Sequence, residues 1–333
     1  MICAVKGALF CRPLHKAYTS LRAYVQSIVE KIISKFFYFG NRPLPPALAE
    51  QRVQELIALK GAKLLHVVNA NNEKVETLYI PSPRSTGNAV IFALNKRMQD
   101  LHPKNIETYL QRGADVVLFN FTKCNGRQYA EDLKEVIAAL KQINPNQRLS
   151  IFTHCASGEP AIAAAAHFQD PNISLILDRT HGNTERLVQS NTVFAHLPCV
   201  REVLQRTFSC QGVQKLEQVP GKVMVLAPAQ SKDDQVMQYG KCPVNNLTYD
   251  LFYKRMQMSR HAKGDEFVAL ENSDHWNRWS YITLNKVIDF LTKQGITASE
   301  HPPVTAAEFP IVPPQPPCLR WTVTQLNKSP FDC

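Results

Sequence analysis

The sequence predicts an α/β fold in which a mostly parallel sheet carries helices on both faces. An antiparallel pair comes first, formed by Lys63–Val68 and Lys74–Ile80 around the turn at residues 69–72. After residue 88, short apolar runs alternate with helical segments, which is the pattern of repeated strand-helix units. The expected strands are Ala89–Leu94, Asp115–Phe121, Arg148–Thr153, Ile173–Leu177, Lys222–Ala227 and Glu266–Leu270. The expected helices are Pro103–Arg112, Tyr129–Ile143, Ser157–Phe168, Asn246–Ala262 and Trp279–Lys293.

Two proline-rich stretches divide the chain into three parts. Residues 1–45 form an N-terminal helical extension, residues 46–300 the main domain, and residues 301–333 a C-terminal extension. Pro46 suits the first position of a helix that runs over Ala47–Lys60 and stops at Gly61. The prolines of the C-terminal extension cannot continue a helix, so this tail is expected to run extended over the surface. It either offers a proline motif to a partner or packs down and buries Phe309 and Trp321.

The segment from about residue 180 to residue 220 is too long for an ordinary strand-helix connection. We expect it to form a helical cap inserted near 180–220, just before the strand Lys222–Ala227. Its apolar residues either line a pocket for an acyl group or pack onto the sheet as ordinary helical faces. These residues are Val193, Phe194, Leu197, Val200, Val203, Leu204 and Phe208.

Composition limits the class of protein. The chain has 333 residues, of which 44% are hydrophobic, so it can bury a large core. No apolar run is long enough to span a membrane, and the N-terminus lacks the pattern of a secretory signal. The nine cysteines show no Cys-x-x-Cys pair, which favours reduced thiols and a cytoplasmic location. Export as a bacterial effector without a cleavable signal would leave no trace in this sequence.

The net charge of +10 is concentrated in the N-terminal extension. Residues 1–45 contain seven Lys and Arg residues against Glu30 alone. Between Leu14 and Phe37 the apolar residues recur every three or four positions, which predicts an amphipathic helix. This helix either docks on the main domain or lies on an anionic membrane surface as a peripheral element. A nucleic-acid partner is not expected, because basic and aromatic residues do not gather on one face elsewhere in the chain.

The stretch from Ser150 to Ala161 carries the strongest chemical signal. An apolar strand ends there, Cys155 follows between small residues, and an alanine-rich helix begins at once. A nucleophile on a sharp strand-to-helix turn requires small residues on both sides. Thr153, Ser157 and Gly158 meet this requirement loosely. The amide of Ala156 would lie at the helix N-terminus, where it can stabilise an oxyanion.

Two further loops follow strands in an order typical of hydrolases. Asp233 and Asp234 come after Lys222–Ala227, and His275 comes after Glu266–Leu270. Since active sites of parallel sheets lie at the carboxyl ends of the strands, these side chains are expected at one edge with Cys155. An alternative interpretation makes Cys155 an inert buried core thiol. For His275 taken alone, a helix-capping or surface residue is the favoured interpretation. No metal-ligand spacing is present, and the chemistry needs no cofactor.

From about residue 60 to residue 295, the sequence resembles the α/β-hydrolase superfamily. The cysteine is similar to that of the dienelactone-hydrolase branch, and the layout is similar to that of lipase-like proteins of intracellular bacterial pathogens. The resemblance implies that Cys155 is the nucleophile, Asp234 the triad acid, with Asp233 as an alternative, and His275 the base. It also implies that Ala156, with Asn95 or Lys96 after the strand Ala89–Leu94, forms the oxyanion hole.

Such a triad would hydrolyse a small-molecule carboxylic ester or thioester, including one with a lipidic acyl chain, through an acyl-enzyme. Two positions depart from the pattern of this family. Thr153 stands where glycine is usual, and the loop at residues 95–97 lacks the usual His-Gly pair. A second hypothesis therefore stays open, in which the chain is a catalytically inactive relative that acts as a binding or membrane-recruitment module.

Overall fold

The computed structural model describes most of the main domain and part of each extension. The described residues are 19–20, 22–24, 26–31, 46–94, 98, 104–123, 125–181, 183–185, 198–228, 238–239, 242–246, 263–270, 279–299 and 302–305. The C-terminal residues after 305, including Phe309 and Trp321, lie outside this set.

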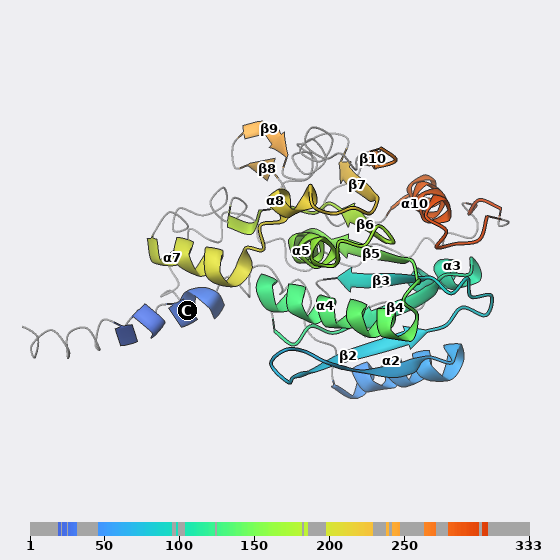
Figure 1. Ribbon diagram of the computed structural model, residues 1–333, viewed down its shortest axis with the longest axis horizontal. Helices are drawn as coiled ribbons and strands as arrows, with labels where there is room; N and C mark the ends of the chain where they lie inside the picture. Colours follow the sequence, from blue (N-terminus) through green and yellow to red (C-terminus); the bar gives the residue numbers. More distant parts are fainter. Residues whose placement is uncertain are drawn as a thin grey trace, which may run out of the picture.

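An eight-stranded sheet forms the centre of the molecule (Figure 1). Its strands lie in the order β1-β2-β4-β3-β5-β6-β7-β10. The antiparallel pairs are β1 with β2 and β2 with β4, and the other pairs are parallel. This confirms the predicted antiparallel start and mostly parallel sheet. The strands are β1 (Lys63–Val68), β2 (Lys74–Ile80), β3 (Ala89–Leu94), β4 (Asp115–Phe119), β5 (Leu149–His154), β6 (Ile173–Asp178), β7 (Val223–Pro228) and β10 (Glu266–Leu270).

Helices cover both faces of the sheet, as the alternating apolar runs predict. The central strands are buried on both sides, so neighbouring residues of β3 enter different cores: Val90 and Phe92 one, Ala89 and Ile91 the other. The first core includes residues of α2 (Pro46–Lys60), α3 (Lys104–Gln111) and α10 (Tyr281–Lys293). The second includes residues of α4 (Gly126–Ile143), α5 (Gly158–Phe168) and α8 (Gly212–Leu216).

Local signals in the sequence explain where several helices begin and end. The α2 helix begins at Pro46 and is followed by Gly61 at φ +64°, as predicted. The side chain of Asn125 caps α4 by accepting from the amide of Gln128. In the same way, Ser280 caps α10 by accepting from the amide of Thr283.

The segment between β6 and β7 contains helices, as predicted for the insertion near 180–220. These are α7 (Pro198–Val203), the π-helical turn η4 (Leu204–Phe208) and α8. Val203, Leu204 and Phe208 are buried. Val193, Phe194 and Leu197 lie outside the described residues.

One expected helix is wrong at its start. Asn246 was assigned to a helix over Asn246–Ala262, but it ends strand β9 (Cys242–Asn246). This strand pairs antiparallel with β8 (Gln238–Tyr239) in a separate two-stranded sheet. Pro243 has no amide hydrogen to donate to a neighbouring strand, but proline is tolerated in edge strands, and both strands of a two-stranded sheet are edge strands. Residues 247–262 lie outside the described part of the chain.

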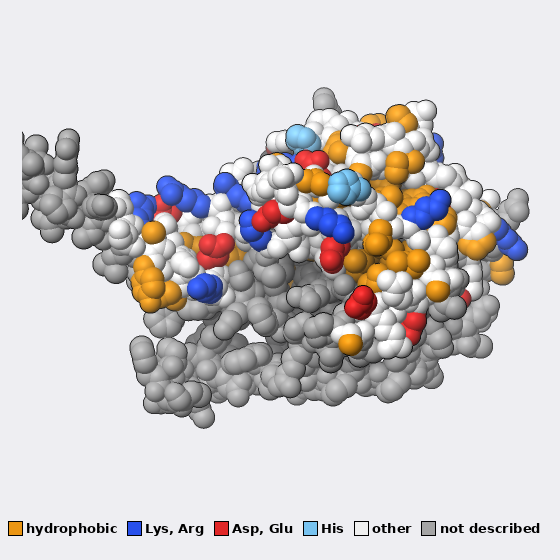
Figure 2. Space-filling view, turned by 90° about the horizontal axis from the view of Figure 1, so that it is seen from below, with side chains coloured by type: hydrophobic (Ala, Val, Ile, Leu, Met, Phe, Trp, Pro, Cys, Tyr) orange, Lys and Arg blue, Asp and Glu red, His pale blue; other side chains and the backbone are white. Residues whose placement is uncertain are grey.

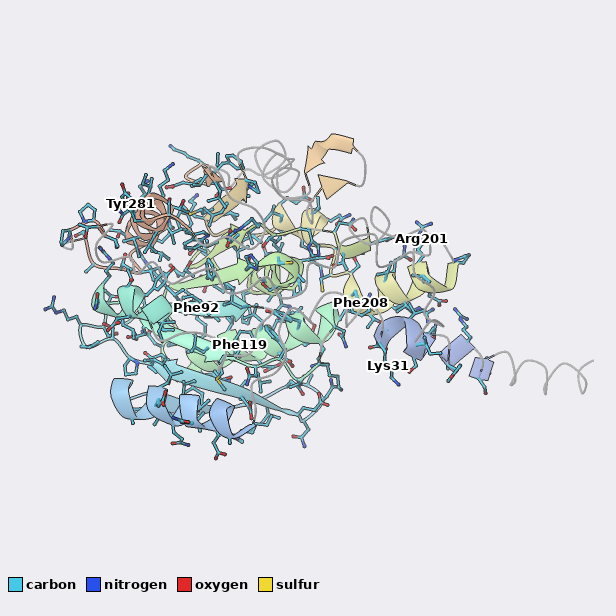
Figure 3. All side chains as sticks on the ribbon, turned by 180° about the vertical axis from the view of Figure 1, so that it is seen from behind. Lys31, Phe92, Phe119, Arg201, Phe208 and Tyr281 are labelled. Atoms are coloured by element: carbon cyan, nitrogen blue, oxygen red, sulfur yellow. The ribbon has the colours of Figure 1, made fainter. Side chains whose placement is uncertain are left out.

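The described part of residues 19–31 is helical, in agreement with the amphipathic pattern. This helix lies beside α7, at the end of the molecule opposite α10 (Figures 1 and 3). Arg22 forms an ion pair with Glu202 of α7. Tyr24 is 66% exposed and Ile28 is 39% exposed, so these two members of the apolar stripe are not packed on the main domain.

Candidate active site

Cys155 occupies a sharp turn between β5 and α5. His154, the last residue of β5, is extended. Cys155 then adopts φ +57° and begins a 3-10 turn over Cys155–Ser157, which leads into α5. A residue with a side chain costs about 1–2 kcal/mol in this left-handed region. The cysteine is 6% exposed. The structure therefore has a sharp strand-to-helix turn at Cys155, with a strained backbone at that residue.

The close contact that this turn requires is made by Gly158. A Cβ atom on Gly158 would lie 1.6 Å from Cγ2 of Thr180, which follows β6 and is fully buried. Thr153 fits instead of crowding the turn, because its hydroxyl donates to the carbonyl of Ile176 at 3.0 Å and lies 3.3 Å from the hydroxyl of Thr180. Thr153 is thus accommodated by the neighbouring strand and the residue that follows it.

Ala156 lies in the 3-10 turn and is 5% exposed. The first amides of a helix have no partner within that helix, so they can bind an anion. The Ser157 side chain ties the same turn to β5, because its hydroxyl donates to the carbonyl of His154 at 2.8 Å and accepts from the amide of His154 at 3.0 Å. These bonds hold the backbone on both sides of the thiol.

The other predicted site residues, Asn95, Lys96, Asp233, Asp234 and His275, lie outside the described residues. The strands that precede them end at one edge of the sheet. Leu94 of β3 is in register with His154 of β5, and His154 with Asp178 of β6. Asp178 is in turn in register with Leu226 of β7, beside β10. The described strand ends that precede these residues therefore lie at the same edge of the sheet as Cys155.

Asp178 is a buried carboxylate at this edge that sequence reasoning did not single out. It is 3% exposed and forms a bidentate ion pair with Arg179, at 2.9 Å to Nε and 3.0 Å to Nη2. Burial alone would raise the pKa of Asp178. The charges of Arg179 and His154, with hydrogen bonds from Arg179 and Trp279, more than offset burial and hold this pKa below its usual value. Asp178 is therefore a stable buried anion.

Glu159, in the first turn of α5, is a second buried carboxylate that the sequence reasoning missed. Its two oxygens accept from the amide and hydroxyl of Thr184, the hydroxyl of Ser209, and the amides of Cys210 and Gly212. Burial raises the pKa of Glu159, although these hydrogen bonds act in the opposite direction. The contacts fasten both ends of the inserted helical segment to the helix that follows Cys155. The sequence signal that could have identified Glu159 is an acidic residue in the first turn of a predicted helix, where a negative charge is favourable.

No group of three His, Cys, Asp or Glu side chains in the described ranges could hold a metal ion. Among the helices that could be searched, none has the length and apolar character to cross a membrane.

The sequence matches no family model and no curated protein. Several solved structures are similar in fold. The esterase Pf2001 of Pyrococcus furiosus superposes with a TM-score of 0.52 and 15% identity, over 70% of this chain and 92% of that chain. Est1E from Butyrivibrio proteoclasticus superposes with a TM-score of 0.52 and 11% identity, over 70% of this chain and 99% of that chain. At this identity the similarity establishes the fold.

Proposed function

We propose that this protein, whose chain has the α/β-hydrolase fold, hydrolyses carboxylic ester or thioester bonds through an acyl-cysteine intermediate. The observation that carries the proposal is the φ of +57° at Cys155, between a buried strand and the helix α5. Strain at a residue with a side chain persists only where the surroundings impose it, and it is concentrated at functional sites. The esterases of similar fold support the same reaction class.

In the proposed reaction, the Cys155 sulfur attacks the acyl carbon of the substrate. His275 takes the thiol proton and returns it to the leaving alcohol or thiol as the carbon–oxygen or carbon–sulfur bond breaks. Water then attacks the acyl-cysteine thioester, which gives a carboxylic acid and restores the thiol. Esters and thioesters suit this chemistry better than amides, whose leaving group is poorer.

We assign supporting roles to the residues on the neighbouring loops. Asp234, or Asp233 in its place, would orient the imidazole of His275 and stabilise its charged form. The amide of Ala156, with that of Asn95 or Lys96, would hold the oxyanion, and one such donor typically contributes about 3–4 kcal/mol. We further propose that the segment near 180–220 acts as a cap over the substrate.

The decisive experiment compares hydrolysis of p-nitrophenyl esters and acyl thioesters by wild type, Cys155→Ala, His275→Ala and Asp234→Asn. We expect the Cys155 and His275 variants to lose at least about 10³-fold in kcat/KM, and the Asp234 variant somewhat less. Cys210→Ala is the matched control, because Cys210 is also a buried cysteine but is not part of the turn between β5 and α5. Equal turnover by all variants would disprove the proposal.

A second candidate function is recruitment to an anionic membrane by the N-terminal helix, with or without catalysis. The observation that favours it is the exposure of Tyr24 and Ile28, one helical turn apart, on a segment whose sequence is strongly basic. Figure 2 shows Lys and Arg side chains beside exposed hydrophobic ones at this projecting end. A lipidic acyl substrate would follow from such recruitment.

Sedimentation with anionic and neutral liposomes tests this second function. We expect wild type to bind the anionic liposomes and a variant without residues 1–45 to stay in solution. Binding that is unchanged by the deletion would show that the N-terminal helix does not bind the membrane.

A further inference from the structure

Glu159 is fully buried in the first turn of α5, just after the candidate nucleophile. Its Oε2 accepts from the amide of Thr184 at 2.8 Å and from the hydroxyl of the same residue. Its Oε1 accepts from the amide of Cys210 at 2.8 Å, the hydroxyl of Ser209 at 3.2 Å and the amide of Gly212 at 3.4 Å. One oxygen therefore binds the inserted segment near its start, and the other binds it near its end.

This arrangement requires an acceptor at both oxygens. The backbone amides of Thr184 and Cys210 can only donate, and a buried amide without an acceptor costs free energy comparable to a lost hydrogen bond. A carboxyl oxygen can accept at either position, whereas glutamine would set its NH₂ group against one of the two amides. Glutamate can thus hold the two parts of the inserted segment at once, and glutamine can hold only one of them.

The beginning of α5 is also fixed to the sheet. The Ser157 hydroxyl bonds to the backbone of His154 at the end of β5, and Gly158 lies against Thr180, which follows β6. Glu159 adds the contact to the inserted segment, whose helix α8 packs beside α5 (Figure 1). Three consecutive residues therefore join the end of the nucleophile turn to three different neighbours.

We infer that Glu159 is a positioning residue, which holds the first turn of α5, and with it the turn at Cys155, against the inserted segment. The inference rests on the proposed function, since it gives this contact a catalytic consequence. Ala156 lies in the 3-10 turn that leads into α5, so a shift of the helix start moves its amide relative to the proposed oxyanion. A misplacement of about 1 Å in a catalytic group can cost about 10²-fold in rate. Because only one of three contacts is weakened, we expect a fraction of that loss, and we expect it in kcat.

Glu159→Gln is the primary test, because glutamine keeps the shape of the side chain and releases one part of the inserted segment. We expect kcat for a p-nitrophenyl ester to fall about tenfold and KM to change by less than about twofold. A rise in KM with the kcat of wild type would mean that the inserted segment only binds substrate, and it would overturn the inference.

Asp115→Asn is the matched control for a merely structural role. Asp115 is also a buried carboxylate, and it accepts from the amide of Ser82 at 2.8 Å and the hydroxyl of Ser85 at 2.9 Å. It begins β4, at the edge of the sheet opposite Cys155. This variant should lose stability and keep the kcat of wild type at a temperature where it is folded. An equal fall in kcat in both variants would overturn the inference.

Ser209→Ala keeps the inference testable if Glu159→Gln fails to fold. It removes one hydroxyl donor and leaves the two amides bound to Oε1 of Glu159. We expect kcat to fall two- to threefold, roughly in proportion to the weaker contact, with KM unchanged. In that case, a Ser209→Ala protein with the kcat of wild type would overturn the inference.

Hydrogen exchange separates this inference from the proposed function. Glu159→Gln should accelerate exchange about tenfold in peptides covering residues 155–166 and 209–216, with no change over residues 79–87. Asp115→Asn should show the reverse pattern. Unchanged exchange over residues 155–166 in Glu159→Gln would overturn the inference whether or not the protein is an enzyme. Faster exchange there, in a protein whose wild type shows no Cys155-dependent hydrolysis, would retain the positioning of the turn and disprove the proposed function.

Discussion

Replacing Gly158 by alanine tests whether close packing between α5 and the end of β6 holds the turn at Cys155. The backbone of Gly158 is helical, with φ −70° and ψ −44°, so its conformation suits any residue. The obstacle is space, because the new Cβ would meet Thr180 at 1.6 Å from Cγ2, 2.7 Å from Cβ and 2.8 Å from Oγ1. Thr180 is fully buried, so it cannot move into solvent.

The magnitude follows from two opposing effects. Overpacking a buried site costs about 1–3 kcal/mol. Alanine regains up to about 1 kcal/mol over glycine in a helix. We expect Gly158→Ala to lower the free energy of unfolding by about 1–2 kcal/mol, which corresponds to about 3–6 °C in the thermal midpoint for a domain of this size.

Urea and thermal unfolding measure this change, and Thr180→Ser provides the matched rescue. Serine removes the clashing methyl group and keeps the hydroxyl that bonds to the carbonyl of Asp178 at 3.2 Å. In the Gly158→Ala background, Thr180→Ser should recover part of the lost stability, although it should cost stability in wild type. A Gly158→Ala protein as stable as wild type, or one that Thr180→Ser fails to improve, would refute the packing argument.

Three further predictions concern the turn, the buried acid and the N-terminal helix. Cys155→Gly should be at least as stable in urea as Cys155→Ala, because glycine adopts φ +57° without strain; a clearly less stable glycine variant would contradict the geometry. Burial raises the folded-state pKa of Glu159 above 4.5, so its carboxyl favours folding most below pH 4.5, and that contribution falls as pH rises from 4.5 through the folded pKa. The unfolding free energy of wild type should therefore decrease more steeply over this range than that of Glu159→Gln, and parallel curves in urea titrations would count against it. Tyr24→Ser with Ile28→Ser should weaken binding to anionic liposomes about tenfold without changing the thermal midpoint, whereas unaltered sedimentation would exclude this face.

Sequence pattern was sufficient for the sheet because the signals there are local and repeated. Strands such as Ala89–Leu94 and Glu266–Leu270 were predicted to the residue, since apolar runs bounded by turn residues leave little choice. The strand at Cys242–Asn246 was not predicted, because Pro243 disfavours a strand and a two-residue partner gives almost no pattern. This segment is a strand because it pairs with β8, and a pairing of this kind leaves no periodic pattern in the sequence.

The candidate site was only partly predictable. The Cys155 turn could be found because strand, small residues and helix follow one another within twelve residues. The compensation for Thr153 could not be found, since it depends on Ile176 and Thr180 of a neighbouring strand and its following turn. The same holds for Phe152 and Trp279, whose rings lie 5.1 Å apart although the residues are far apart in sequence.

Backbone strain is found at two neighbouring strand ends at this edge of the sheet. Five described residues other than glycine have positive φ, and three lie where such conformations are ordinary: Asn72 in a hairpin turn, Gln169 at the end of α5 and Gln211 before α8. The other two, Cys155 at φ +57° and Arg179 at φ +46°, directly follow the neighbouring parallel strands β5 and β6. Neither is a residue type that favours this region. Surrounding packing and the ion pair of Arg179 with Asp178 must impose this strain, which destabilises the fold at two neighbouring strand ends.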